Sequence, residues 1–230
     1  LWRKAVPQTV RQNFWEKLDS ISMFTIAAED DVIPWELLYP ADGDLDNGFL
    51  AEQFPVVRRV YSKDQVSVLP ISSAAYVLPA NSPTNARDEI QEISTLLGGQ
   101  IANRGTLSDL EAIDDLINST DLPGIIHFAC HNAFSAQNGA SLTFSDGPWT
   151  PTDLSPAVTR KALAKAHPLV FFNACRTAGK IPWFFQTSGW APQFMEAGAG
   201  AFIGTLWAVR SSSAKTFAEE FYREFVCKGQ

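Results

Sequence analysis

Short apolar runs alternate with amphipathic segments from residue 74 onward, and this alternation predicts a parallel β-sheet with helical connections. Apolar runs predict strands at residues 74–78, 100–103, 125–131, 141–144, 168–175 and 200–207. The segments between several of these runs carry apolar residues at helical spacing, as in the series Ala86, Ile90, Ile93 and Leu97. The pattern therefore predicts an α/β fold with a mostly parallel central sheet.

The ends of these helices are also marked in the sequence. Gly98-Gly99 closes the helix that contains Ile90, and Thr106 is the predicted N-cap of the next helix. A further helix is expected over residues 158–164 and another around residues 191–197. The last helix carries aromatic residues on one face, namely Phe217, Phe221 and Phe225.

Residues 1–70 follow a different pattern, without alternating strands and helices. A helix-like opening is followed by a predicted strand at 23–27 and a polar turn at 42–44, and aromatic and proline residues punctuate the segment. We therefore expect a smaller N-terminal lobe over residues 1–70, packed on the sheet of a domain that covers residues 71–230.

The net charge and the hydropathy of the chain limit which classes of binding partner are expected. The chain has a formal net charge of −7 and no cluster of basic residues longer than two, so a nucleic acid or an anionic membrane is not an expected partner. No apolar run approaches the roughly 20 residues that a membrane-spanning helix needs. These features predict a cytoplasmic protein.

The cysteine content agrees with a reducing compartment. Three cysteines, at positions 130, 175 and 227, are too few and odd in number for a disulfide framework. The chain opens at Leu1 with an amphipathic stretch already under way, so we expect it to be part of a longer protein.

Two of the apolar runs end in reactive side chains. His131 and Cys175 close the runs at 125–131 and 168–175, and they lie 175 − 131 = 44 residues apart. Chemistry in open α/β sheets gathers at the carboxyl ends of the strands, so the two residues can share a site as a thiol nucleophile and its base.

The same residues have other interpretations. Cys175 could be an inert core thiol, because cysteine is among the most buried residue types. His127 is expected to be a hydrogen-bonded core histidine. A zinc site built from His127, Cys130, His131 and Cys175 is disfavoured because adjacent strand residues project to opposite faces, and we expect no metal and no cofactor.

The residues around Cys175 resemble a known signature. Asn173-Ala174-Cys175-Arg176 nearly reproduces the caspase sequence Q-A-C-[RQG]-G, which has a histidine roughly 50 residues upstream. Over nearly its whole length the chain resembles the CHAT domain family, the caspase-like peptidases found beside tetratricopeptide repeats. The matching segments, in the family's order, are residues 33–38, 49–52, 127–131, 173–177, 198–199 and 203–209.

The resemblance implies a caspase-like α/β/α sandwich that cleaves peptide bonds with a cysteine–histidine dyad. Cys175 would attack the scissile carbonyl and His131 would transfer the protons. The backbone amides of Cys175 and Asn132 would form the oxyanion hole. Family members usually have glycine where this chain has Asn132, and glycine accepts backbone angles that asparagine tolerates only in part.

The resemblance also implies where a substrate would bind. Asn173, two residues before the cysteine, falls where some arginine- and lysine-specific relatives carry aspartate at the base of the specificity pocket. Asp88 or Asp146 could supply that acid instead, although helix-start charge and turn formation are their ordinary roles. The Trp207 strand and the Arg210 loop after it would wall the groove, and Arg210 could favour an acidic substrate side chain.

The resulting hypothesis is a regulated prokaryotic cysteine endopeptidase that cleaves a protein partner and is controlled by a regulatory domain or partner, such as one of the tetratricopeptide-repeat type. The loop from Thr177 to Gly189 is the segment expected to reorder on activation. One alternative is an inactive CHAT-like pseudopeptidase that serves as a scaffold or sensor, favoured by Asn132 and Ser211. Another is a thiol hydrolase or transferase that acts on small molecules.

Overall fold

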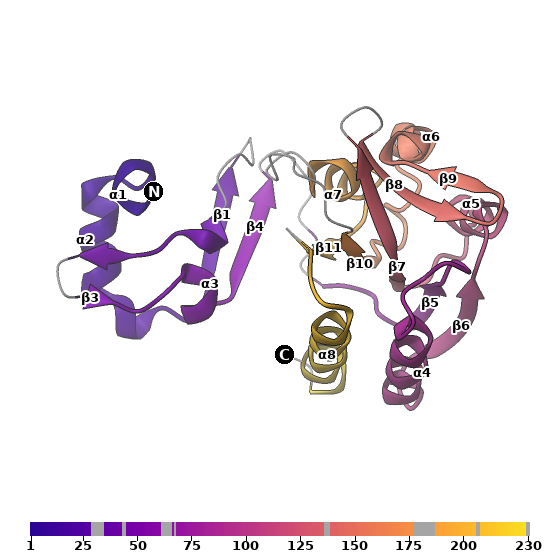
Figure 1. Ribbon diagram of the computed structural model, residues 1–230, viewed down its shortest axis with the longest axis horizontal. Helices are drawn as coiled ribbons and strands as arrows, with labels where there is room; N and C mark the ends of the chain where they lie inside the picture. Colours follow the sequence, from indigo (N-terminus) through magenta and orange to yellow (C-terminus); the bar gives the residue numbers. More distant parts are fainter. Residues whose placement is uncertain are drawn as a thin grey trace. The chain divides into compact units, whose positions relative to one another are not determined.

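The computed structural model describes residues 1–28, 35–42, 45–60, 66, 68–135, 139–176, 187–205 and 208–228. The chain folds as two compact units, Leu1–Asp64 and Gln65–Gln230 (Figure 1). The packing of the N-terminal lobe on the sheet stays a prediction. The cysteine-to-helix loop over residues 177–186 and Trp207 lie outside the described residues.

The N-terminal unit is built around a small aromatic core. Its parallel strand pair joins β1 (Phe24–Ala28) to β4 (Val56–Val60), and its short hairpin joins β2 (Ala41–Asp42) to β3 (Leu45–Asp46). The helices are α1 (Trp2–Ala5), α2 (Gln8–Glu16) and α3 (Leu50–Gln53), with short 3-10 turns η1 (Leu18–Ser20) and η2 (Trp35–Leu37). The buried residues that hold the unit together are Trp2, Val6, Phe14, Leu38 and Leu50.

The second unit contains a seven-stranded sheet whose five parallel strands run in the order β11-β10-β7-β5-β6. Antiparallel β8 pairs with the end of β7, and β9 pairs with β8. The strands are β5 (Ser73–Val77), β6 (Ala102–Leu107), β7 (Ile125–Ser135), β8 (Gly139–Phe144), β9 (Gly147–Trp149), β10 (Leu169–Arg176) and β11 (Ala201–Gly204). The predicted α/β class with a mostly parallel sheet is confirmed.

Helices cover both faces of this sheet, as a caspase-like α/β/α sandwich requires (Figure 1). The apolar residues of α4 (Ala86–Leu97) and α8 (Ser211–Tyr222) join the core of one face, and α8 continues as the π-helical turn η5 (Arg223–Cys227). The other face packs against α5 (Leu110–Asn118), the 3-10 turn η3 (Pro151–Leu154), α6 (Ser155–Arg160) and α7 (Thr187–Glu196). No helix in the described ranges is both long and apolar enough to cross a membrane.

Burial on both faces explains why the central strands are nearly continuous apolar runs. In β7, Ile125 and Ala129 belong to the core beside α4 and α8, whereas Ile126, Phe128 and Cys130 belong to the opposite core. Every second residue therefore faces the same helical layer. This alternation determines which side of the sheet each candidate site residue occupies.

Several predicted element ends need correction. The N-cap of α5 is Asp109, whose side chain accepts a hydrogen bond from the Ala112 amide, and Thr106 lies inside β6 instead. The helix expected over 158–164 begins earlier and ends at Arg160, because Lys161 takes a left-handed conformation with φ of 48°. Ring stacking places Phe217, Phe221 and Phe225 on one face of the last helix, but Phe217 is 58% exposed. The buried face of α8 is formed instead by Ala214, Ala218 and Tyr222.

The start of β7 offers a sharp test of this packing. A Cβ atom at Gly124 would lie 2.2 Å from the Pro70 carbonyl oxygen and 2.8 Å from the Ile71 Cα. Because both contacts are with backbone, Gly124→Ala should displace the chain and lower the thermal midpoint by roughly 2–12 °C, from an overpacking cost of about 1–3 kcal/mol. Gly99→Ala is the control, since nothing lies within 4 Å of its Cβ position. Equal midpoints for the two variants, measured by calorimetry, would contradict the described contact.

Candidate active site

The site is built on the parallel pairing of β7 with β10. Their register runs from Leu169 opposite Ile125 to Arg176 opposite Asn132, and it sets Cys175 directly opposite His131. Paired strands lie about 4.8 Å apart, so the backbones at these two positions are immediate neighbours. The structure describes the backbone of Cys175 but not its side chain. The distance between the sulfur and the imidazole stays a prediction.

His131 occupies the face of β7 that the α4 and α8 layer covers, because it follows Ala129 by two residues. The residue is partly exposed. Its Nδ1 atom is buried and has no hydrogen-bond partner within the described part of the chain. This ring is therefore not tied into the core by the described residues, unlike the other histidine of the same strand.

His127 is a core residue, as expected from the sequence. It is 0% exposed, stacks on Phe171 with ring centroids 5.0 Å apart, and both of its nitrogens have partners. Nδ1 lies 3.1 Å from the Tyr222 hydroxyl and Nε2 lies 2.9 Å from Glu89 Oε1. These contacts leave no ring nitrogen of His127 for a reaction.

Glu89 is a buried carboxylate that the sequence analysis did not single out. It lies on α4, is 3% exposed, and its Oε1 accepts from the Asn173 amide at 2.8 Å as well as from the His127 ring. The sequence carried a signal for it: position 89 follows Ala86 by three and precedes Ile93 by four, so it lies on the apolar face of the predicted helix. A charged residue there needs polar partners.

Asn173 is 7% exposed and donates to Glu89 through its side-chain amide. This contact explains why an amide fits at the position, because an aspartate would set two carboxylates at hydrogen-bond distance. The acid that contacts Asn173 is thus Glu89, and no contact of Asn173 with Asp88 or Asp146 occurs among the described residues. A role for Asn173 in binding substrate stays a prediction.

Tyr222 completes the cluster from α8. Its burial, followed by the nearby Tyr76 and Glu89, raises the pKa of the Tyr222 phenol well above its ordinary value, so the hydroxyl stays protonated. Hydrogen bonding is satisfied when Tyr222 O–H donates to His127 Nδ1 and His127 Nε2–H donates to Glu89. We call Glu89, His127, Asn173 and Tyr222 the buried polar cluster.

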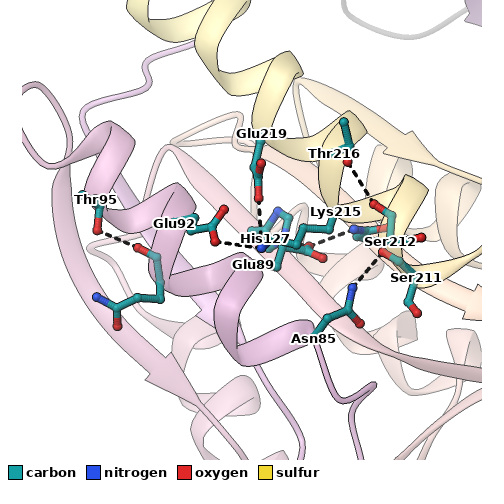
Figure 2. Close-up of polar contacts among 12 residues, drawn as sticks. Asn85, Glu89, Glu92, Thr95, His127, Ser211, Ser212, Lys215, Thr216 and Glu219 are labelled. Carbon is teal, nitrogen blue, oxygen red and sulfur yellow. Dashed lines mark hydrogen bonds and ion pairs between the residues drawn. The ribbon is translucent and has the colours of Figure 1, made fainter.

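Further polar contacts tie α4 to α8 above this cluster. Figure 2 shows Lys215 between two carboxylates, with Nζ 2.8 Å from Glu92 and 3.5 Å from Glu219. At the starts of the two helices, Asn85 donates to the Ser211 carbonyl oxygen at 2.8 Å (Figure 2). The loops that enter α4 and α8 are thereby joined to each other.

The predicted oxyanion residue Asn132 continues the strand. Its side-chain oxygen accepts from the Trp190 indole at 3.3 Å, and it pairs with Arg176 on one side and Leu142 on the other. Among the described non-glycine residues, positive φ angles occur only at Lys161 and His167. Asn132 therefore does not need the backbone freedom of the glycine that is usual in the family.

The remaining predicted substrate residues have different surroundings. Asp88 is an exposed residue in the first turn of α4. Asp146, in the turn between β8 and β9, accepts from the Leu110 amide at 2.9 Å and so supports the start of α5, on the face opposite His131. Arg210 is exposed and immediately precedes α8. A substrate role for each of them stays a prediction.

No group of three or more histidine, cysteine, aspartate or glutamate side chains that could hold a metal occurs among the residues that the structure describes. The zinc alternative also involved the Cys175 side chain, which lies outside them.

The contrast between the two histidines gives a stability prediction. His127→Ala removes one of two donors from a buried carboxylate, which costs about 3–5 kcal/mol and should lower the thermal midpoint by roughly 10 °C. His131→Ala should change it by no more than about 2 °C, because the residue is partly exposed and surface changes stay within about 0.5 kcal/mol. Thermal unfolding of both variants checks this, and the reverse order would show that the roles of the histidines had been exchanged.

Comparison with known proteins agrees with the resemblance. The model of the CHAT domain family matches residues 8–229, which is nearly the whole chain. A search of curated proteins found none that matches. With a mostly parallel sheet between two helical layers and this family match, the chain belongs to the CHAT family of caspase-like peptidases.

Proposed function

We propose that this chain is a cysteine endopeptidase in which Cys175 is the nucleophile and His131 the general base. The observation that carries the proposal is the register of β7 with β10, which aligns the two residues on adjacent strands. The buried Nδ1 of His131, without a partner in the described part of the chain, also supports it. A base must have a ring nitrogen available to take the thiol proton.

The chemistry follows from these roles. Cys175 sulfur attacks the scissile carbonyl carbon as a thiolate, and its proton passes to His131. The carbonyl π-electrons move to the oxygen, where the backbone N–H groups of Cys175 and Asn132 stabilise the negative charge. When the tetrahedral intermediate collapses, the C–N bond breaks and His131 gives its proton to the departing amine. A water molecule then hydrolyses the thioester, with His131 again taking and returning a proton.

The position of Asn132 supports its share in the oxyanion hole. It follows His131 directly, and its register partner is Arg176, so its backbone lies at the same edge of the sheet as that of Cys175. Its side chain is held on the α7 side of the sheet by Trp190. That contact directs the asparagine side chain away from the face that carries His131.

Two other functions use the same residues. An inactive scaffold or sensor is favoured by Asn132, which replaces the family's usual glycine, and by Ser211 at the start of α8. A thiol hydrolase or transferase that acts on small molecules would need the same nucleophile and base. Covalent labelling separates these functions from an endopeptidase.

We predict that a panel of peptidyl acyloxymethyl ketones with varied P1 side chains labels Cys175. Labelling should disappear in Cys175→Ala and slow by about 100-fold or more in His131→Ala, which is the ordinary worth of a general base. Cys227→Ser is the control, because Cys227 lies at the end of η5 and contacts the Leu96 carbonyl. Mass spectrometry of the labelled peptides gives the site and the rate.

Two other labelling results would assign the alternative functions. Labelling by chloroacetamide but by no peptidyl reagent would indicate a small-molecule thiol enzyme. Equal labelling of Cys175 with and without His131, at the rate of an ordinary thiol, would indicate a pseudopeptidase.

We propose that the substrate is a protein and that a regulatory domain or partner, such as one of tetratricopeptide-repeat type, controls cleavage in the cytoplasm of a prokaryote. The family resemblance supports this part. Turnover of a peptide library by residues 1–230 should be slow and should rise at least tenfold when the chain is joined to its natural flanking regions. Equal, rapid turnover in both forms would contradict control by such regions.

A further inference from the structure

The buried polar cluster occupies a special place relative to the proposed dyad. His127 and Asn173 lie on the same two strands as His131 and Cys175, and His127 precedes His131 by four residues while Asn173 precedes Cys175 by two. Residues two apart on a strand share a face and are separated by about 7 Å. The cluster therefore lies on the same face of the sheet as the proposed dyad, one such step from Cys175 on β10 and two steps from His131 on β7.

One carboxylate oxygen joins the two strands. Glu89 Oε1 contacts His127 of β7 at 2.9 Å and Asn173 of β10 at 2.8 Å. These two residues are diagonal to each other in the register, because Asn173 is opposite Ala129.

The cluster also connects the helices that begin near the carboxyl edge of the sheet. Glu89 lies in the first turn of α4, and Tyr222 of α8 holds the other side of the His127 ring at 3.1 Å. Figure 2 shows Glu89 and His127 between the two helices and the strands. The buried polar cluster thus connects four elements, namely α4, α8, β7 and β10.

We propose that Glu89 is a positioning residue for the Cys175–His131 pair: through Asn173 and His127 it fixes the ends of β10 and β7 relative to each other. This inference rests on the proposed function. The carboxylate acts through its two strand partners and does not itself contact substrate. An apolar residue at position 89 would pack against the same strands. It would make no hydrogen bonds, so it would not fix His127 and Asn173 relative to each other.

The test measures the reactivity of Cys175 toward iodoacetamide at pH 6.5 in the chain of residues 1–230, resolved by mass spectrometry from Cys130 and Cys227. Glu89→Ala should lower the rate at Cys175 at least tenfold. Glu89→Gln keeps an oxygen that accepts from Asn173 and His127, so its rate should stay within about threefold of the unmodified chain. The pH midpoint of the reaction should move toward that of an ordinary thiol in Glu89→Ala, near pH 8.5.

Two further variants separate positioning from stability. Ile93→Val shortens a fully buried residue of the same helix and leaves every polar group of the cluster in place. It should lower the thermal midpoint and leave the Cys175 rate within twofold, when all variants are measured well below their midpoints. If Glu89→Ala does not fold, Tyr222→Phe removes only the hydroxyl that holds His127, and it should slow the reaction at least threefold.

The outcomes distinguish this inference from the proposed function. A Cys175 rate that falls in His131→Ala but stays within twofold in Glu89→Ala and Tyr222→Phe would overturn the positioning role and leave the dyad intact. A rate that is the same with and without His131 would overturn the dyad, and the positioning role with it. Loss of rate in Ile93→Val equal to that in Glu89→Ala would also overturn the inference, since the cluster would then act only through stability.

Discussion

The parallel pairing of β7 with β10 is the constraint on which the site depends. Eight residues of β10 pair in unbroken register with eight of β7, and a shift of one residue would move every side chain of β10 to the other face of the sheet. Helices pack their apolar sides against both faces of the sheet. Such a shift would therefore move Phe172 to the face that now holds Asn173, and Asn173 to the face that now holds Phe172. The energy that fixes the register is therefore mostly burial, and the alignment of His131 with Cys175 follows from it.

The buried polar cluster is an exception inside this apolar layer. A buried carboxylate loses several kcal/mol of hydration unless it is paired and hydrogen-bonded. Glu89 recovers that loss through Asn173 and His127, and Tyr222 satisfies the second nitrogen of His127. Apolar packing alone tolerates small shifts of one helix or strand against another. The directional hydrogen bonds of the cluster allow fewer such arrangements. Its location on the same face of the sheet as the proposed dyad, rather than elsewhere in the core, is what gives it functional interest.

Much of this architecture could be read from the sequence because the central strands are buried on both faces. The apolar runs at 125–131 and 168–175 predicted β7 and β10, and the helical spacing of Ala86, Ile90, Ile93 and Leu97 predicted α4, which ends at Gly98 as expected. Solvent-facing elements carried weaker signals. β6 is largely exposed, so only its beginning was predicted, within residues 100–103, and Thr106 inside it was taken for a helix cap. In the N-terminal unit, Arg58 and Arg59 interrupt the apolar pattern of β4, so this strand was not predicted.

The site was predicted less completely than the fold. His131 and Cys175 stood at the ends of apolar runs, where a chemical role was visible from position alone. Glu89 was missed because its role depends on Asn173 and His127, which are 84 and 38 residues away in the chain. The aromatic residues of the last helix gave the larger hydrophobic signal, yet alanines and Tyr222 form its buried face. Close packing of α8 on α4 and the sheet favours small residues there, and hydropathy does not report that preference.

Proteolysis by the His131–Cys175 pair is the central claim, and a proteome-wide profile of new N-termini tests it most directly. Extracts treated with the chain, together with the proposed regulatory domain or partner, would be compared with extracts treated in the same way with its Cys175→Ala variant. The account predicts a small set of new N-termini that share a residue preference on the P1 side and that are absent with the variant. Identical profiles for the two proteins, with the unmodified chain folded and the proposed regulator present, would contradict it.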